Sequence, residues 1–436
     1  MKTAAAKAAV VKPGGALQGR IEVPGDKSIT HRAIMLGGLA RGETLIRGYL
    51  PADDCLRTVA AMRALGRVID TVDSDDRPAL RIAAGPAALR EPEDVIDCGN
   101  SGTSIRLLTG LVAGLPMCTV LTGDASLRRR PMARVVEPLR AMGAMIVGRE
   151  DGRLAPLTVA GRRLKAGEFR LPVASAQVKS AILLAGLGAE GRTAVYEPSA
   201  SRDHTERMLR AFGVPVSIDG GAVAVTGPVN LTGATVDVPG DISSAAFLIA
   251  AALLVPGSEL EIGRVGVNPT RTGLLDVLAS MGASVKLGNA REVSGEPTAS
   301  LTVRTTRLRG ATIKGSLVPR AIDEFPILCV LAAFAEGETI IDDAGELRVK
   351  ESDRIRVMAE ELAKMGIRVE ERPAGMRIVG PQRAAGARCS SHGDHRIAMA
   401  LAVAALRATG PTTIDDVECV GTSFPGFFEL IERVRR

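Results

Sequence analysis

The sequence contains few of the residues that stack nucleic-acid bases, bind metals or form disulfides. Among its 436 residues there is no Trp, and there are two Tyr, eight Phe, four His and six Cys. So few aromatic rings disfavour a nucleic-acid-binding protein, because single strands are held largely by stacking on aromatic side chains. The cysteines form no C-x-x-C pair, and with four histidines they give no spacing typical of a zinc site. We therefore expect a reducing cytoplasm as the location and no bound metal.

A long hydrophobic run is also missing. The best candidate, "SSAAFLIAAALLVPG", has about eleven apolar residues before Pro256, whereas a membrane-spanning helix needs about 20. The first residues, "MKTAAAKAAVVKPGG", have lysines among the apolar residues and lack the core of a signal peptide, so we expect a flexible lead-in. The formal net charge of +6 is compatible with nucleic acid, an acidic surface or small anionic substrates.

The chain repeats one pattern six times, and its length predicts two or three domains. The copies begin at residues 23, 97, 171, 238, 318 and 391, each with an apolar helix-like run. A turn and a short strand follow, as in "RGETLIRG" and "EGETIIDDA", and then an amphipathic run. In the first five copies this run ends in a glycine suited to a helix C-cap: Gly66, Gly143, Gly213, Gly282 and Gly366. The pattern predicts strand, helix, strand, helix, strand, strand in each copy.

The first helix of each copy is apolar nearly all round, which is typical of a buried helix. Because six buried helices need shared packing partners, we predict an α/β protein with two clusters of three helices, each surrounded by sheets. The matching "VPGD" at Val23 and Val238 predicts one lobe at 23–240 and a second at 1–22 and 241–436. The N-terminal strand is expected to pair with the second lobe, so that the chain crosses twice and forms a hinge.

The copies differ most where their first helices start, and the unpaired N–H groups of a helix start attract anions. Three such starts pointing together in each lobe would face a cleft that grips anionic substrates. Cations gather at the same boundaries: Lys27, Arg32, Arg128, Arg129, Arg130, Arg202, Arg271, Arg348, Lys350, Arg354, Arg356 and Arg396. Arginine binds phosphate and carboxylate through two parallel N–H donors. Asp323 and Glu351 lie among these cations, where each is a salt-bridge partner, a helix cap or a proton carrier.

At these positions the sequence resembles the EPSP synthases along nearly its whole length. The matching segments are "PGDKSITHR", "GNSGTSIR", "GDASLRRRPM", "ASAQVKS", "DVPGDISSAAF", "NPTRTG", "IDEFPIL", "ELRVKESDR" and "DHRIAMA". "GDKS", "SAQVK", "RDHTE" and "NPTR" are similar to the class II bacterial branch. The resemblance implies a two-lobed inside-out α/β barrel with three βαβαββ units per lobe. It also implies transfer of the enolpyruvyl group of phosphoenolpyruvate to the 5-hydroxyl of shikimate 3-phosphate, with release of phosphate and no metal or organic cofactor. We expect a cytoplasmic monomer.

The resemblance also implies roles for single residues. Shikimate 3-phosphate would bind to Lys27, Ser28, Arg32, Ser175, Ala176, Gln177, Arg202, Asp323 and Lys350. Phosphoenolpyruvate would bind to Lys27, Gly102, Arg130, Gln177, Arg354 and Arg396. Asp323 would take the proton of the attacking hydroxyl, and Glu351 with Lys27 would handle the proton at the methylene carbon.

Two positions depart from the family pattern. Thr422 stands where class I enzymes have a Lys, which leaves one cation to be replaced. Gly102 stands where some glyphosate-tolerant class II enzymes have Ala, so we expect no guaranteed tolerance here. The nearest alternative is a UDP-N-acetylglucosamine enolpyruvyltransferase, but that family needs a Cys where this chain has Ala125 and Ser126. A non-catalytic repeat scaffold is the alternative from a different class.

Overall fold

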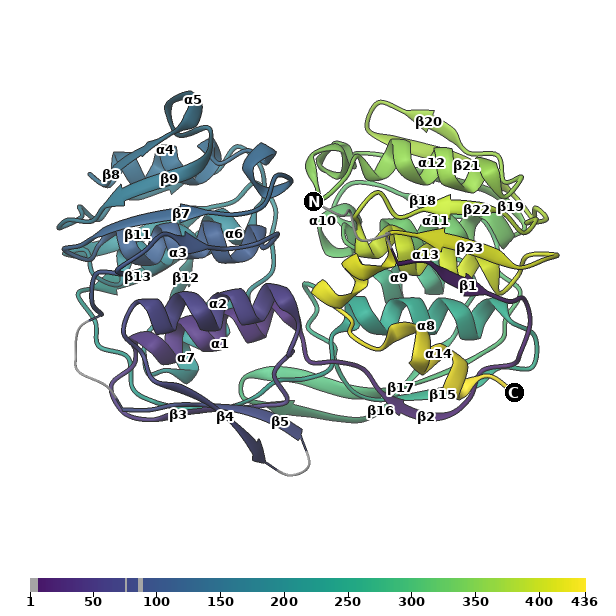
Figure 1. The fold of residues 1–436 in the computed structure, drawn as a ribbon, viewed down its shortest axis with the longest axis horizontal. Coiled ribbons are helices and arrows are strands. Elements are labelled where there is room, and N and C mark those ends of the chain that lie inside the picture. Colours follow the sequence, from purple (N-terminus) through teal and green to yellow (C-terminus); the bar gives the residue numbers. More distant parts are fainter. Residues whose placement is uncertain (1–6, 75–76, 85–88) are drawn as a thin grey trace. The chain divides into compact units, whose positions relative to one another are not determined.

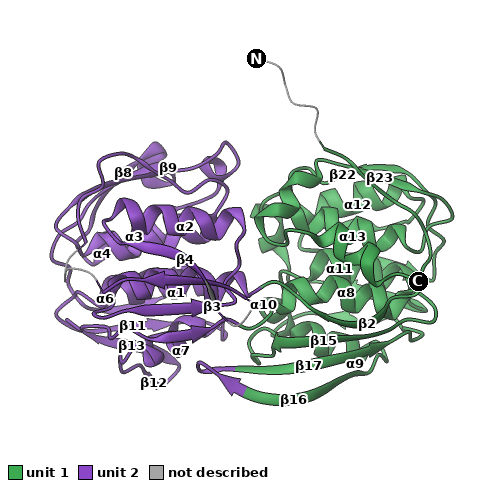
Figure 2. Cartoon of the chain, turned by 60° about the horizontal axis from the view of Figure 1, so that its bottom comes forward, with its two compact units in different colours: residues 1–24, 239–291, 297–436 green, residues 25–238, 292–296 purple. Residues whose placement is uncertain are grey.

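The chain forms two compact units, which Figure 2 colours separately. The structure is a computed structural model that describes residues 7–74, 77–84 and 89–436. Unit 1 comprises residues 1–24, 239–291 and 297–436, and unit 2 comprises residues 25–238 and 292–296. Residues 1–6 of the expected lead-in lie outside the described residues.

Unit 2 contains three copies of the predicted succession. Its described residues form three four-stranded sheets with the orders β14-β3-β5-β4, β6-β7-β9-β8 and β10-β11-β13-β12. In each sheet the first two strands are parallel and the other neighbours are antiparallel. The elements are α1 (Lys27–Leu39), β3 (Thr44–Arg47), α2 (Asp53–Ala64), β4 (Ile69–Ser74), β5 (Arg77–Ile82), β6 (Ile96–Asp97), α3 (Gly102–Ala113), β7 (Cys118–Thr122), η1 (Leu127–Arg129), α4 (Ala133–Ala141), β8 (Met145–Gly148), α5 (Arg149–Gly152), β9 (Leu154–Ala160), β10 (Glu168–Arg170), α6 (Ala176–Gly186), β11 (Gly191–Tyr196), α7 (His204–Ala211), β12 (Ser217–Asp219), β13 (Ala222–Gly227) and β14 (Thr235–Asp237).

Unit 1 contains the other three copies. Its described residues form the sheets β16-β17-β15-β2, β18-β19-β21-β20 and, with three strands, β1-β23-β22. The elements are β1 (Ala9–Val11), β2 (Gln18–Glu22), α8 (Ile242–Leu254), β15 (Glu259–Gly266), α9 (Gly273–Ser280), β16 (Val285–Val293), β17 (Glu296–Arg304), β18 (Thr312–Ile313), α10 (Leu317–Ala321), α11 (Phe325–Phe334), β19 (Gly337–Ile341), η2 (Gly345–Val349), α12 (Arg354–Lys364), β20 (Glu370–Arg372), β21 (Gly375–Gly380), β22 (Arg388–Ser390), α13 (His395–Ala405), β23 (Thr412–Asp415), η3 (Val417–Thr422) and α14 (Phe427–Val434).

The first helix of every copy is buried, as its apolar surface requires. In unit 1, α8, α11 and α13 contact one another, and Figure 1 shows them inside the unit with strands around them. In unit 2, α3 contacts both α1 and α6. Each unit has one large apolar core, built from these helices and the inner faces of its sheets. All five predicted C-cap glycines have a positive φ, between 79° and 97°, which confirms their role as helix ends.

In each unit, one sheet contains a strand that directly precedes, in the chain, the first helix of the other unit. β2 precedes α1 in the chain but pairs in parallel with β15, from Gln18 opposite Glu259 to Glu22 opposite Gly263. In the same way β14 precedes α8 but pairs in parallel with β3. The predicted pairing of the N-terminal strand is therefore confirmed.

The lead-in was predicted to be flexible, and residues 9–11 correct that prediction. They form β1, which pairs antiparallel with β23, and the Val11 side chain is buried. The sixth copy ends in α14, so no hairpin of its own covers the edge of β23. The apolar Ala-Val-Val of β1 fills this edge, and backbone groups that would otherwise face solvent are paired.

The tip of the hairpin between β16 and β17 belongs to unit 2, which the sequence did not predict. Ser294 Oγ accepts a hydrogen bond from the backbone N–H of Asp237 at 2.9 Å. The carbonyl of Gly295 accepts one from Arg207 Nη1 at 2.8 Å, and Glu296 Oε1 lies 2.7 Å from His204 Nδ1. These polar contacts join the tip to α7 and β14.

The described part of the chain has neither a membrane-spanning helix nor a cluster of metal-binding side chains. Within it, no helix has the length and apolar character needed to cross a membrane. The same residues contain no group of three or more His, Cys, Asp or Glu side chains placed to hold a metal ion.

Candidate active site

The starts of the buried helices differ in charge, because their N-cap residues differ. Asp26, Asp241 and Asp394 cap α1, α8 and α13, and each carboxylate accepts a backbone N–H of its helix at 2.9 Å. Ser101 and Ser175 cap α3 and α6 at 3.1 and 3.4 Å. An Asp cap already places a negative charge on the helix start, whereas a Ser cap leaves the positive end of the helix dipole uncompensated. The N-caps of α3 and α6, both in unit 2, are therefore neutral serines rather than carboxylates.

Arg32 is one predicted site residue that is nearly fully buried. Its Nε donates to Thr205 Oγ1 at 2.7 Å, and its Nη2 donates to Ser180 Oγ at 2.8 Å. Its Nη1 donates to the carbonyl of Ser28, one helical turn earlier, at 3.0 Å. At least three of the five N–H donors of the guanidinium are therefore used: two join α1 to α6 and α7, and the third bonds within α1.

The other predicted shikimate 3-phosphate residues of unit 2 lie at helix starts. Lys27 is the first residue of α1, and its Nζ lies 3.0 Å from Asp54 Oδ2. Ser175 caps α6, and Ala176 is the first residue of that helix. Arg202 is half-buried in the segment just before α7. Unit 2 thus places these polar groups at the N-terminal ends of three helices.

Gly102 stands beside a pair of guanidinium groups. A Cβ atom on Gly102 would lie 3.0 Å from Arg106 Nη1 and 3.2 Å from Arg130 Nη1. Arg106 also donates to Gln177 Oε1 at 2.7 Å, and Arg130 hydrogen-bonds to Asn100 Oδ1. Gly102 and Gln177 therefore both lie next to the Arg106 guanidinium, and Gly102 also lies next to Arg130. Arg106 was not predicted, although it lies in the quoted "GNSGTSIR", one helical turn after Gly102.

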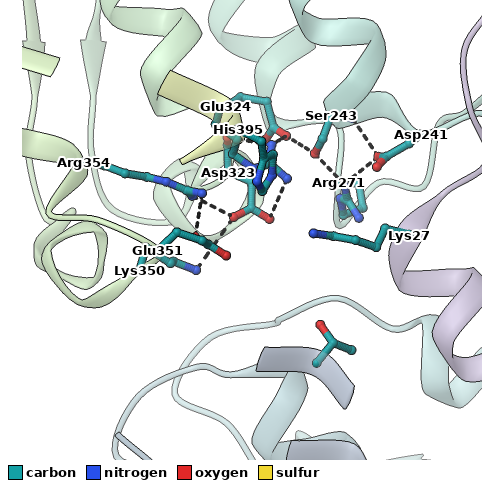
Figure 3. Close-up of polar contacts among 12 residues, drawn as sticks. Lys27, Asp241, Ser243, Arg271, Asp323, Glu324, Lys350, Glu351, Arg354 and His395 are labelled. Atoms are coloured by element: carbon teal, nitrogen blue, oxygen red, sulfur yellow. Dashed lines mark hydrogen bonds and ion pairs between the residues drawn. The ribbon is translucent and has the colours of Figure 1, made fainter. Parts of the chain in front are cut away.

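In unit 1, three cations lie near the carboxylate of Asp323, and Figure 3 labels two of them, Lys350 and Arg354. Oδ1 of Asp323 lies 3.8 Å from Lys350 Nζ and 3.6 Å from Arg354 Nη1, and Oδ2 lies 3.7 Å from Arg396 Nη2. Arg396 also donates to the backbone carbonyl of Asp323 at 2.9 Å. Asp323 lies in the turn between α10 and α11, just before the apolar helix that ends in the core. The turn therefore holds a carboxylate at the edge of the core and within reach of three positive charges.

Arg354 is buried between two carboxylates as well. Its Nε lies 2.8 Å from Asp394 Oδ2, and its Nη2 lies 2.7 Å from Glu351 Oε2. Burial by itself raises the pKa of the Asp394 carboxyl, but the positive charge of Arg354 holds that pKa below its ordinary value. Burial by itself lowers the pKa of Arg354, and the charges of Asp394 and Glu351 raise it above its ordinary value. The guanidinium therefore stays charged in a dry environment.

A second chain of polar contacts in unit 1 (Figure 3) ends at Arg396, which also pairs with Asp323. Arg271 Nη2 lies 3.2 Å from Asp241 Oδ1 and donates to Ser243 Oγ at 2.7 Å. Ser243 Oγ in turn donates to Glu324 Oε1, which lies 3.8 Å from Arg396 Nη1. Arg271 was among the cations noted in the sequence, whereas the contacts of Asp241, Ser243 and Glu324 were not predicted.

Burial separates the cations of the predicted set. Arg130 is buried, whereas its neighbours Arg128 and Arg129 are exposed. Arg348 forms ion pairs with two carboxylates near the surface, and Arg356 forms an exposed pair within α12. These four residues face solvent or form ion pairs near the surface. In the described part of the chain, they do not contact the buried polar groups around Asp323 or Gly102.

Thr422 does not replace the missing cation by itself. Its Oγ1 donates to the carbonyl of Cys419 at 2.7 Å and lies 3.4 Å from Nδ1 of the buried His395. A neutral hydroxyl is thus fixed at the end of η3, next to the imidazole at the start of α13.

The fold superposes on solved structures of an EPSP synthase and of an enolpyruvyl transferase. The EPSP synthase from Acinetobacter baumannii superposes with a TM-score of 0.86 at 44% identity, over 98% of each chain. The enolpyruvyl transferase NikO from Streptomyces tendae superposes with a TM-score of 0.79 at 20% identity, again over 98% of each chain, which establishes a common fold. The predicted inside-out α/β architecture is therefore confirmed.

Sequence comparison narrows the class to one family. Residues 11–431 match the family described as EPSP synthase (3-phosphoshikimate 1-carboxyvinyltransferase). The 3-phosphoshikimate 1-carboxyvinyltransferase of Geobacter metallireducens is 57% identical over 97% of this chain and 98% of its own length. The enzyme of the same name from Gloeobacter violaceus is 56% identical over 98% of both. The chain therefore belongs to the EPSP synthase family and has its 3-phosphoshikimate 1-carboxyvinyltransferase activity, as predicted.

Proposed function

We propose that the chain binds phosphoenolpyruvate and shikimate 3-phosphate through the residues predicted above. Shikimate 3-phosphate would contact Lys27, Ser28, Arg32, Ser175, Ala176, Gln177, Arg202, Asp323 and Lys350. Phosphoenolpyruvate would contact Lys27, Gly102, Arg130, Gln177, Arg354 and Arg396. The observation that carries the proposal is the carboxylate of Asp323, held within 4 Å of Lys350, Arg354 and Arg396.

Electrostatics explain why so many fixed cations are needed. Each substrate carries a carboxylate and a phosphate, and the phosphate contributes a charge of about −1.5 to −2 near neutral pH. Two like unit charges about 5 Å apart repel each other by about 3 kcal/mol at an effective dielectric constant near 20. Guanidinium groups that are already oriented by their neighbours offset this repulsion without reorganising.

The chemistry requires two steps with three proton transfers. In the first step, the 5-hydroxyl oxygen attacks C2 of phosphoenolpyruvate, Asp323 takes the hydroxyl proton, and the methylene carbon gains a proton. In the second, the bond to phosphate breaks, and the methyl carbon loses a proton so that the double bond forms again. We assign the proton at this carbon to Glu351 together with Lys27. Fixed positions for these groups convert the encounter into an effectively intramolecular reaction.

Phosphate release from phosphoenolpyruvate tests the proposal directly. We expect release that depends on shikimate 3-phosphate and is absent with UDP-N-acetylglucosamine as the acceptor. Release with the nucleotide sugar and not with shikimate 3-phosphate would place the chain with the alternative acceptor. Absence of binding to either acceptor in calorimetry would favour a scaffold.

We also propose the class II subtype, a monomeric state and a cytoplasmic location. Arg202 in "RDHTE" and Thr422 in place of a Lys support the subtype. Sedimentation of the purified chain tests the monomer, and a mass of twice the chain would refute it.

A further inference from the structure

We propose that Glu197 is a positioning residue for the phosphate of shikimate 3-phosphate. It would act through Ser175 and through the segment that carries Arg202. The inference rests on the proposed function, which assigns Ser175 and Arg202 to that phosphate.

The carboxylate of Glu197 joins the start of α6 to the segment between β11 and α7. Glu197 directly follows β11, and its Oε1 accepts the backbone N–H of Ser175 at 2.9 Å. Its Oε2 accepts the hydroxyl of Ser201 at 2.9 Å and lies 2.8 Å from Lys179 Nζ. The Glu197 side chain is only 7% exposed. One buried carboxylate therefore fixes both the N-cap of α6 and the residue next to Arg202.

Lys179 anchors this carboxylate from within α6. It lies one helical turn after Ser175, its side chain is 2% exposed, and its Nζ lies 2.8 Å from Glu206 Oε1 on α7. Burial by itself lowers the pKa of the Lys179 ammonium, but the charges of Glu206 and Glu197 raise it above its ordinary value. A buried, charged lysine thus links α6, α7 and the segment between them.

Glu197 would act by orienting the start of α6, because its own negative charge opposes the binding of a phosphate. A carboxylate has no N–H or O–H to offer a phosphate when ionised, and it repels one. By accepting the Ser175 backbone N–H, however, it holds the backbone of the N-cap residue, from which the Ser175 side chain and the first N–H groups of α6 project. The N-cap itself is a neutral serine, and the Glu197 charge beside it is paired with Lys179, so the positive end of the α6 dipole remains available to an anion.

Glu197→Gln tests the inference, with Glu206→Gln as the matched control. Both changes remove one charge beside the same Lys179. In Glu197→Gln, however, the side-chain NH2 replaces one of the two carboxylate oxygens. It then faces either the Ser175 N–H or the pair Lys179 and Ser201. Facing the neutral Ser175 N–H is less unfavourable than facing the charged Lys179, so the Ser175 N–H loses its acceptor. Glu206 pairs with Lys179, whereas the hydrogen bonds of Ser175 and Ser201 go to Glu197, so the change at Glu206 leaves both of these hydrogen bonds in place.

Steady-state kinetics and calorimetry give the readout. We expect Glu197→Gln to raise the KM and the Kd for shikimate 3-phosphate about tenfold or more, from the loss of a hydrogen bond to a charged group. The KM for phosphoenolpyruvate and kcat at saturation should change by less than about threefold, since positioning at one phosphate affects mainly ground-state binding. Glu206→Gln should leave the KM for shikimate 3-phosphate within about twofold at a similarly lowered Tm. Equal effects of the two variants on this KM would overturn the inference.

Two further variants separate this inference from the proposed function and from misfolding. Arg202→Ala should raise the KM for shikimate 3-phosphate; if it does not, the assignment of the phosphate site is wrong. If it does and Glu197→Gln does not, only the positioning role is wrong. Should Glu197→Gln fail to fold, Ser201→Ala decides, because it removes one donor and keeps the buried ion pair. A raised KM for shikimate 3-phosphate in Ser201→Ala supports the inference, and an unchanged KM refutes it.

Discussion

Replacing Asp323 with Asn separates its proposed role as a base from its role in holding the surrounding cations. The carboxylate lies between 3.6 and 3.8 Å from three cationic groups. Each such pair of unit charges is attracted by about 4 kcal/mol at an effective dielectric constant near 20. A neutral amide of the same shape leaves the cations with more charge to offer anionic substrates, so binding should not weaken. It cannot accept the hydroxyl proton, and loss of a general base lowers kcat by about 10² to 10⁴.

The folded structure should tolerate this change. Arg354 keeps its pairs with Asp394 and Glu351, and Arg396 keeps its hydrogen bond to the backbone carbonyl of Asp323. We therefore expect a Tm within a few degrees of the wild type, in keeping with one altered polar group.

Phosphate release, measured at saturating and limiting concentrations of each substrate, gives kcat and both KM values. The control is Glu360→Gln, which removes the acid of an exposed ion pair on α12 and should leave kcat unchanged. For Asp323→Asn we expect a large loss of kcat with KM values equal to the wild type or lower. A kcat within about threefold of the wild type, or a loss confined to KM, would refute the role of Asp323 as the base.

Three other changes test the fold and the site. Gly143→Ala should lower the free energy of unfolding by about 1 kcal/mol, because φ is +97° at this position. The control Gly188→Ala should not lower it, because φ is not positive there and no described atom lies within 4 Å of the added Cβ. Equal chemical denaturation midpoints for the two variants would contradict this reasoning. Gly102→Ala places a methyl 3.2 Å from Arg130 Nη1, so the Ki for glyphosate should rise, and equal Ki values would refute the steric argument. The depressed pKa of Asp394 means that its stabilisation is complete above the ordinary Asp pKa and is lost as the pH falls through the depressed value. The Tm of Asp394→Asn should therefore fall less steeply with acid than that of the wild type, and parallel curves would contradict this.

Local patterns were enough for much of the fold. The apolar helices had to be buried whatever their partners, and glycines such as Gly66 mark helix ends because only glycine adopts a positive φ at little cost. The repeated "VPGD" marked a lobe boundary, and the N-terminal strand was expected to pair with the second lobe, as β2 does with β15. These features depend on residues close together in the sequence or on comparison of the copies.

The polar networks were less accessible, because they join residues far apart in the chain. Arg354 meets Asp394 across 40 positions, and Arg396 meets the carbonyl of Asp323 across 73. No local pattern distinguishes Arg130, which is buried, from Arg129 beside it, which is exposed.

The sequence by itself determined the sixfold repeat, the buried helices, the family and the set of candidate residues, because these follow from periodicity and from matching motifs. Only the tertiary structure decided how β1 completes the sixth sheet and how residues 292–296 join unit 2. It also decided which helix starts keep a positive end for anions. That choice depends on whether an Asp or a Ser reaches the first N–H groups, as at Asp241 and Ser175.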